Sequence, residues 1–327
     1  AANVHGKNQS SEGLFSNQIK SIEFYHPETG YITVKRNDKF LFNLVVGGFG
    51  LSGIITKVEL KLASFKDKSI HRKILYFQSH DEALNELINC NNDTCFSYTW
   101  HNLMKIKNKK VESLVFTGFF KNRQNWKKSQ NSKIIVPKLH NLYRAPFNFY
   151  NKTFTSFILD SYKKIQVLSS AEKEIKIEEM LFPLLSKEIY FSLYGANGFH
   201  EFQIIIPTKN FSKMFDSILD YIIANNIIIP LASTKLFKGK QELLNFSGNG
   251  ICLSLNFARN KKNKTFINFL DKAICEYNCI PSLIKDSRLP KSIFDKTYYE
   301  ADKFRKMIKK FDPNRLFKSE LSSRLGI

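Results

Sequence analysis

The chain has 327 residues, of which 43% are hydrophobic and 14% aromatic, and its formal net charge is +21 at pH 7. This length and apolar content are enough for about two domains with buried cores, and no run of about eighteen apolar residues indicates a membrane-spanning helix. The positive charge favours anionic partners such as phospholipid headgroups or phosphorylated substrates, but no motif indicates nucleic-acid binding, so nucleic acid is not expected.

The first 65 residues have the pattern of a β-rich segment. The stretch 21–36, SIEFYHPETGYITVKR, predicts two strands joined by a turn at 27–30. Two further apolar runs, LFNLVV at 41–46 and IITKVELKL at 54–62, predict two more strands.

Between these last two runs lies a glycine stretch that matches a nucleotide-binding motif. Gly48, Gly50 and Gly53 have the G-x-G-x-x-G spacing of a Rossmann turn. In a Rossmann unit this turn opens a helix, whose N-terminus holds the pyrophosphate. Here the residues that follow alternate between charged and apolar from Lys57 to Leu62, which predicts a strand. The sequence therefore predicts strand, glycine bend, strand, and argues against an NAD-binding Rossmann unit.

From about residue 66 the pattern changes to strands followed by helices. Three such pairs are predicted, at 73–88, 202–226 and 251–277, and they indicate an α+β domain with helices on one face of a sheet. The region 104–180 mixes cations with aromatic residues, which suits either an interfacial contact with lipid headgroups or a set of solvated loops. The tail, 281–327, has helix signals that stop at Asp312-Pro313, and we expect it to return to the first domain.

No catalytic triad, nucleophile motif or metal-ligand spacing is present, and two single residues are the candidates for chemistry. His5 lies beside Gly6 and Lys7, which suits contact with a flat anionic or electron-accepting cofactor, although an ordinary loop histidine fits as well. Lys285 could orient a substrate hydroxyl or phosphate, or stabilise negative charge on a reduced cofactor. The alternative for Lys285 is a surface lysine paired with Asp286.

Three blocks of sequence, taken together and in this order, resemble one family: HGKNQSSEGLFSNQIKSIE, VVGGFGLSGIITKVEL and IKDSRLPKSIFDKTYYEADKFRKMIKKFDPNRLFKSELSSRLG. They are similar to the flavoprotein oxidases of the vanillyl-alcohol oxidase (PCMH) type, and among these to the decaprenylphosphoryl-ribose 2′-oxidases, the flavoprotein half of an epimerase. The resemblance covers nearly the whole chain. It implies an α+β fold in which residues 1–65 and 281–327 form part of a split FAD-binding domain, with an antiparallel, helix-covered substrate-binding domain at 66–280.

The same resemblance implies that the upstream part of the FAD domain is missing from this chain. In the family that part carries the loop that binds the pyrophosphate, and any covalent histidine link to the flavin would also lie there. The resemblance therefore implies that this chain alone binds FAD poorly or not at all.

The resemblance also assigns individual residues. Lys285, in the KDSR block, would be catalytic together with His5. The flavin-binding positions would be Ala2, Asn3, Val4, His5, Ile55 and Ser282. The substrate-facing positions would be Lys235, Gln203, Trp100, Tyr194 and Ser254. Two of these depart from the family pattern, because Ser282 replaces a tyrosine that contacts the flavin and Ser254 replaces a pocket cysteine.

The function implied is FAD-dependent oxidation of a secondary sugar hydroxyl, with hydride transfer to the flavin. The expected substrate is a polyprenyl-phosphate-linked pentose, and the keto product would pass to a separate short-chain reductase. The expected location is the cytoplasm, with peripheral contact to the anionic surface of the inner membrane. Two alternatives stay open: an aldonolactone or sugar-alcohol oxidase of the same fold, and a basic binding module with no catalysis.

Overall fold

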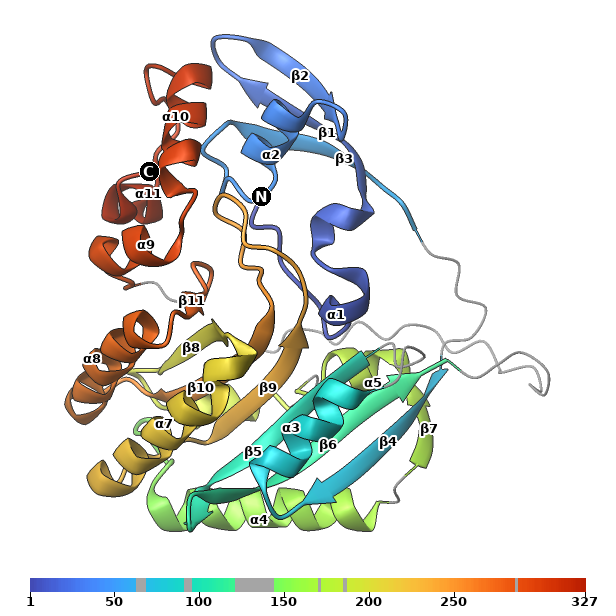
Figure 1. Cartoon of the computed structure of the whole chain (residues 1–327), viewed down its shortest axis with the longest axis vertical. Helices are drawn as coiled ribbons and strands as arrows, with labels where there is room; N and C mark the ends of the chain where they lie inside the picture. Colours follow the sequence, from blue (N-terminus) through green and yellow to red (C-terminus); the bar gives the residue numbers. More distant parts are fainter. Residues whose placement is uncertain (63–68, 91–95, 121–143, 170–171, 185–186, 286–287) are drawn as a thin grey trace.

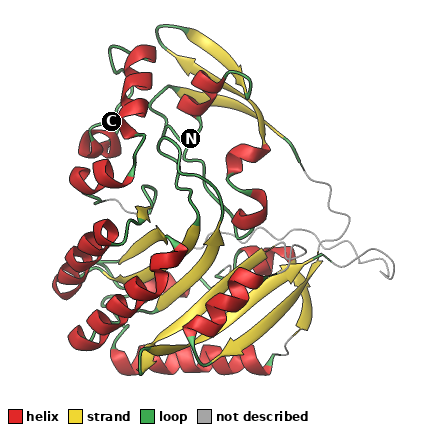
Figure 2. Cartoon of the chain, in the orientation of Figure 1, coloured by secondary structure: helices red, strands yellow, loops and turns green. Residues whose placement is uncertain are grey.

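The computed structural model describes the chain except for residues 63–68, 91–95, 121–143, 170–171, 185–186 and 286–287. The described residues form two antiparallel sheets that lie at opposite ends of the molecule (Figure 1). A small sheet and the C-terminal helices occupy one end, and a large sheet with its covering helices occupies the other (Figure 2). The fold is therefore mixed α and β with antiparallel sheets, as the α+β prediction requires.

The small sheet has three strands in the order β2-β1-β3. Their bounds are Ile19–His26 for β1, Gly30–Lys35 for β2 and Ile54–Leu60 for β3. The predicted strand pair at 21–36 is confirmed, with Phe24 opposite Ile32 and His26 opposite Gly30 in an antiparallel register. The strand predicted after the glycine stretch is confirmed as β3, which pairs with β1.

The strand predicted at 41–46 is wrong, because these residues lie in and just after helix α2, Lys39–Val45. Asp38 caps this helix, since its carboxylate accepts a hydrogen bond from the Leu41 amide at 3.0 Å. Phe42 and Val45, three positions apart, both pack into the core of the small sheet. A short apolar run is compatible with either a strand or a buried helix, and the Asp38 cap favours the helix here.

The glycine stretch lies between α2 and β3, and the protein's own atoms fill the space beside Gly47, Gly48 and Gly53 but not beside Gly50. A Cβ atom at Gly53 would lie 2.5 Å from the Tyr25 carbonyl oxygen, and the residue has a φ of +141°. A Cβ atom at Gly47 would lie 2.2 Å from the side-chain oxygen of Asn245. These glycines therefore let segments of this chain approach one another closely.

We expect Gly53→Ala to lower the free energy of unfolding by about 2–4 kcal/mol, because the new methyl group meets Tyr25 and the backbone is held at a positive φ. Gly30→Ala is the matched control, since Gly30 has a φ of +72° but nothing within 4 Å of its Cβ position. The control should lose only about 1–2 kcal/mol. Urea denaturation of the two variants measures the difference, and equal losses would contradict the close-approach explanation.

The large sheet has eight strands in the order β11-β8-β10-β9-β5-β6-β4-β7. Every pair of neighbouring strands in it is antiparallel. The bounds are β4 Ser69–Phe77, β5 Phe96–Lys107, β6 Lys110–Phe119, β7 Glu172–Lys176, β8 Phe199–Ile206, β9 Leu231–Phe237, β10 Gly250–Ala258 and β11 Ile280–Pro281.

Helices cover both faces of the large sheet. The three predicted strand–helix pairs are confirmed as β4 with α3 (His80–Asn89), β8 with α7 (Phe211–Asn225) and β10 with α8 (Lys261–Glu276). These three helices pack into one apolar core on one face, through residues such as Leu84, Phe215 and Phe266. Helix α4, Lys152–Leu168, packs instead against a second core formed by Tyr98, Trp100 and Phe116. The expectation of helices on one face is therefore wrong for α4.

The remaining helices are short or belong to the tail. Their bounds are α1 Gln9–Glu12, η1 Phe15–Gln18, α5 Ile177–Leu181, α6 Ile189–Ser192, η2 Thr208–Asn210, α9 Lys291–Thr297, α10 Ala301–Phe311 and α11 Glu320–Leu325. Helix α10 ends at the predicted stop and packs against α2. The rings of Phe311 and Phe24 lie 5.9 Å apart, so the end of α10 packs against the small sheet (Figure 1). Among the described residues, no helix is both long and apolar enough to cross a membrane.

Candidate functional site

A row of side chains crosses four strands of the large sheet and ends at the residue after β11, on the face opposite α7 and α8. Directly paired residues of neighbouring strands point to the same face. The register places Trp100 of β5 opposite Ser233 of β9, Ser233 opposite Ser254 of β10, and Ser254 opposite Gln203 of β8. The amide of Ser282, just after β11, donates to the Gln203 carbonyl at 2.8 Å. The row therefore brings together four of the residues predicted for the site.

Two polar atoms of this row are buried without a hydrogen-bond partner among the described residues. Gln203 donates through Nε2 to the Ser254 hydroxyl at 2.9 Å, which leaves its Oε1 atom unpaired. The hydroxyl of Ser282 is also unpaired, although the residue is only 1% exposed. Unpaired buried polar atoms cost stability. A ligand with a polar edge would relieve this cost at both atoms.

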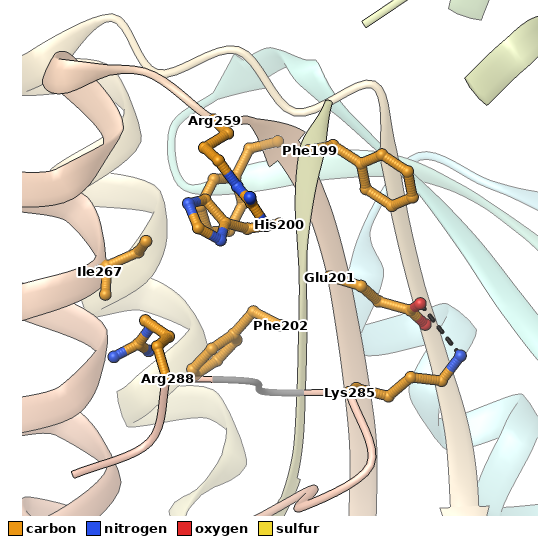
Figure 3. Close-up of a pocket in the computed structure, with 9 residues that line it drawn as sticks. Phe199, His200, Glu201, Phe202, Arg259, Ile267, Lys285 and Arg288 are labelled. Carbon is orange, nitrogen blue, oxygen red and sulfur yellow. Dashed lines mark hydrogen bonds and ion pairs between the residues drawn. The ribbon is translucent and has the colours of Figure 1, made fainter. Parts of the chain in front are cut away.

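Lys285 forms an ion pair with Glu201, which lies on β8 two residues before Gln203. The Lys285 ammonium lies 3.0 Å from Glu201 Oε2. Figure 3 marks this contact with a dashed line. Glu201 is therefore on the same face of β8 as Gln203. The two side chains line a pocket of approximately 40 Å³ with His200, Arg259 and Arg288, which is too small for a sugar. The alternative partner of Lys285, Asp286, lies outside the described residues.

His5 lies over the same face of the sheet, at the end of β9. Its ring makes an edge contact with Phe237, with the ring centres 4.6 Å apart, and a tilted contact with Phe246. Burial, and the positive charges of Lys235, Lys285 and Lys7, lower the pKa of His5 to about 3. At neutral pH the imidazole is therefore uncharged and surrounded by cations. This electropositive setting suits an anionic or electron-rich group.

Lys7 is a residue of this site that the sequence reasoning did not select. Its Nζ atom donates to the Leu181 carbonyl and lies 5.1 Å from the centre of the Tyr98 ring. Burial, with a smaller effect from Lys235, lowers the pKa of Lys7 to about 7. A lysine with such a pKa is an uncharged base in about half of the molecules at neutral pH. Its place two residues after His5 was the only signal in the sequence.

Three other predicted positions, Tyr194, Asn3 and Ile55, are already packed or hydrogen-bonded within the protein. Tyr194 is only 1% exposed, and its hydroxyl is hydrogen-bonded to that of Tyr190 at 2.7 Å, in an aromatic cluster beside β10. The Asn3 side chain donates to Asn245 and accepts from the Ser16 amide, so it is already hydrogen-bonded within the protein. Ile55 packs in the core of the small sheet, opposite Phe24.

The first residues of the chain complete the predicted set. Ala2 is half-buried, whereas Val4 is 47% exposed. The Val4 carbonyl accepts a hydrogen bond from the Phe15 amide, and the Ala1 carbonyl accepts one from the Phe49 amide. The N-terminal segment is thus held between the glycine stretch and the large sheet.

The polar row and the buried cations thus lie on one face of the large sheet. Comparison with known proteins supports a relationship to an oxidase family. The chain matches no protein-family model. It is 26% identical over 341 residues to the decaprenylphosphoryl-beta-D-ribose oxidase of Mycolicibacterium smegmatis (strain ATCC 700084 / mc(2)155). This similarity covers 99% of the chain and 72% of that protein.

Proposed function

We propose that this protein is an FAD-dependent oxidoreductase that oxidises a secondary hydroxyl of a polyprenyl-phosphate-linked pentose. The similarity to the oxidase of Mycolicibacterium smegmatis extends over 99% of the chain. The observation that carries the proposal is the row from Trp100 to Ser282, which has two unpaired polar atoms and lies on the sheet face over which the uncharged His5 packs. This arrangement suits the binding of a polar, electron-accepting cofactor ring next to a sugar substrate.

The residues present fit a flavin. The Ser282 hydroxyl and the side-chain Oε1 atom of Gln203 are unpaired, and the cations Lys235 and Lys285 act electrostatically on His5. In this proposal Ala2 to His5, Ile55 and Ser282 hold the cofactor, with residues 1–65 and 281–327 as the FAD-binding part. Gln203, Ser254, Lys235, Trp100 and Tyr194 face the substrate, within a substrate-binding part at 66–280.

Each side chain then has a role that follows from its chemistry. When bound, the flavin supplies the redox chemistry by accepting a hydride from the substrate carbon. Lys285 donates a hydrogen bond to the reacting hydroxyl and orients it, and Gln203 fixes a second sugar oxygen. Lys7 is not placed to take the hydroxyl proton, because it lies over Tyr98 of β5, three strands away from Glu201 of β8, with which Lys285 is paired. His5, with a pKa of about 3, is too weak a base for this step.

The product of this reaction is a keto sugar that still carries its lipid phosphate. Completing an epimerisation requires a reductase that delivers hydride to the opposite face, so we propose a separate short-chain reductase as the consumer. The net charge of +21 supports contact with an anionic membrane, where a polyprenyl phosphate is embedded. In this proposal the protein is cytoplasmic and peripheral to the inner membrane. Failure of the full-length protein to pellet with anionic liposomes would contradict the membrane contact.

Visible absorption spectroscopy tests the cofactor. The protein at its full natural length, purified with added FAD, is expected to keep flavin absorption after desalting. Anaerobic addition of a polyprenyl-phosphate-linked pentose should then bleach it. Bleaching by a soluble aldonolactone or sugar alcohol instead would favour an oxidase of free sugars. Absence of any retained flavin would contradict the oxidase proposal and leave a basic binding module as the better explanation.

A further inference from the structure

A cluster of three potential metal ligands lies far from the large sheet, where the tail meets the small sheet. His26 is the last residue of β1, Glu28 lies in the turn before β2, and Asp312 follows the last residue of α10. One ligand atom from each of these residues lies within 4.8 Å of the others. The histidine ring is packed between Phe311 and Phe317, with ring centres 5.2 and 5.6 Å away.

The buried pair in this cluster has incomplete polar contacts. The side chains of His26 and Asp312 are both 0% exposed, and Nε2 lies 3.7 Å from Oδ2, which is too far for a hydrogen bond. Neither His26 Nε2 nor Asp312 Oδ1 has a hydrogen-bond partner among the described residues. Asp312 Oδ2 accepts from the Leu316 amide at 2.7 Å. Two fully buried atoms, one on each side chain, are thus left unsatisfied at the same point.

The position of Asp312 adds to this cost. It stands at the C-terminal end of the 11-residue helix α10, where the helix dipole is negative and favours a cation. A positive charge close to it would stabilise a buried carboxylate at this end, beyond the one hydrogen bond from the Leu316 amide. No hydrogen bond joins Asp312 to His26 Nε2, which lies 3.7 Å away.

We propose that His26, Glu28 and Asp312 bind a divalent transition-metal cation. One imidazole nitrogen and two carboxylates match the donor set that Zn²⁺ and its neighbours accept. Two ligand atoms that share an ion at about 2.0–2.2 Å lie about 3–4 Å from each other, so the 3.7 Å gap fits a bridging ion better than a hydrogen bond. The two carboxylates also balance the charge of a divalent cation. Glu28 is exposed, which leaves room for water on the ion and a route to it.

Binding requires one local change at the histidine. The Glu28 amide approaches His26 Nδ1 at 3.3 Å, a weak contact that places the imidazole proton on Nε2. When the cation takes Nε2, that proton moves to Nδ1 and the weak contact opens. The cation then joins the β1–β2 turn to the end of α10, next to the hydrogen bond between Asn314 and Glu28.

The test uses Zn²⁺ alone as the probe on the whole chain, stripped with a chelator, reloaded and desalted. We expect elemental analysis to find about one zinc ion per molecule in the wild type and none in Glu28→Gln. Loading with zinc should also raise the melting temperature of the wild type by roughly 2–5 °C. Glu28 is the residue to change because its side chain is exposed, so its loss leaves no buried charge. In Glu28→Gln the affinity for zinc should fall by about tenfold or more.

Glu59→Gln is the matched control, an exposed glutamate on the same sheet but outside the cluster. It should take up zinc and shift its melting temperature as the wild type does. The proposal is overturned if the wild type keeps no more zinc than Glu28→Gln after desalting, or if loading raises both melting temperatures equally, because the metal then binds elsewhere.

Discussion

Lys285→Met is expected to lower kcat/KM for sugar oxidation by about 10²–10³-fold, because it removes the donor proposed to hold the reacting hydroxyl. Folding should be almost unaffected. The ion pair that Lys285 makes with Glu201 is partly exposed on both sides, and such pairs contribute about 0–1 kcal/mol. Steady-state kinetics on the flavin-loaded protein, with a urea denaturation curve for each variant, separates the two effects.

Glu201→Gln is the matched control for this experiment. It removes the partner of the ion pair but leaves the ammonium of Lys285 in place, so the loss in kcat/KM should stay below about tenfold. If Lys285→Met kept its activity within threefold of the wild type, Lys285 would have no catalytic role. If both variants lost activity equally, the pair itself, rather than the lysine, would be the functional unit.

The second large effect concerns Lys7 and the pH dependence of stability. The folded-state pKa of Lys7 is about 7, lowered from 10.5, so between these values the unfolded chain binds a proton that the folded chain does not. Stability therefore rises with pH across this window. From pH 7 to pH 8.5 this single group should add on the order of 1–2 kcal/mol to the free energy of unfolding.

Lys7→Met removes this titration. We expect the variant to be more stable than the wild type at pH 7 and below, with the advantage shrinking as pH rises towards 8.5. Measurements stay below pH 9, because the buried Cys252 and Cys279 have raised pKa values and begin to matter above it. Lys57→Met, at an exposed lysine of β3, should follow the wild-type pH dependence. A Lys7→Met variant whose difference from wild type does not change with pH would contradict the lowered pKa.

Much of the fold could be predicted because its elements have clear periods. The alternation that follows Gly53 identified β3, and the three strand–helix pairs stand out by length and spacing. Helix α2 was missed because LFNLVV is short and apolar throughout, so that only the Asp38 cap distinguishes helix from strand. The side of the sheet that α4 covers could not be predicted, because it depends on contacts such as that of Tyr162 with Trp100.

The site was predicted in part, through family resemblance more than through pattern. Gln203 and Ser254 could be placed on strands, but only the register shows that they are directly opposite each other. Glu201 and Lys7 were missed because a charged residue in a strand or a loop carries no sign of its partner. The unpaired atoms of Gln203 and Ser282 result from tertiary packing, which cannot be read from a local stretch of sequence.

The return of the tail to the small sheet has a consequence for biosynthesis. Glu28 and Asn314, which are hydrogen-bonded to each other, stand 286 positions apart in the chain. At about 5–20 residues per second, a ribosome needs on the order of 15–60 s to make the second after the first. During that interval the small sheet lacks α10, and the side of Phe24 that Phe311 covers in the finished fold is open to other nascent chains. Its maturation should therefore depend on holding chaperones more than that of the large sheet, whose strands are all synthesised before the tail.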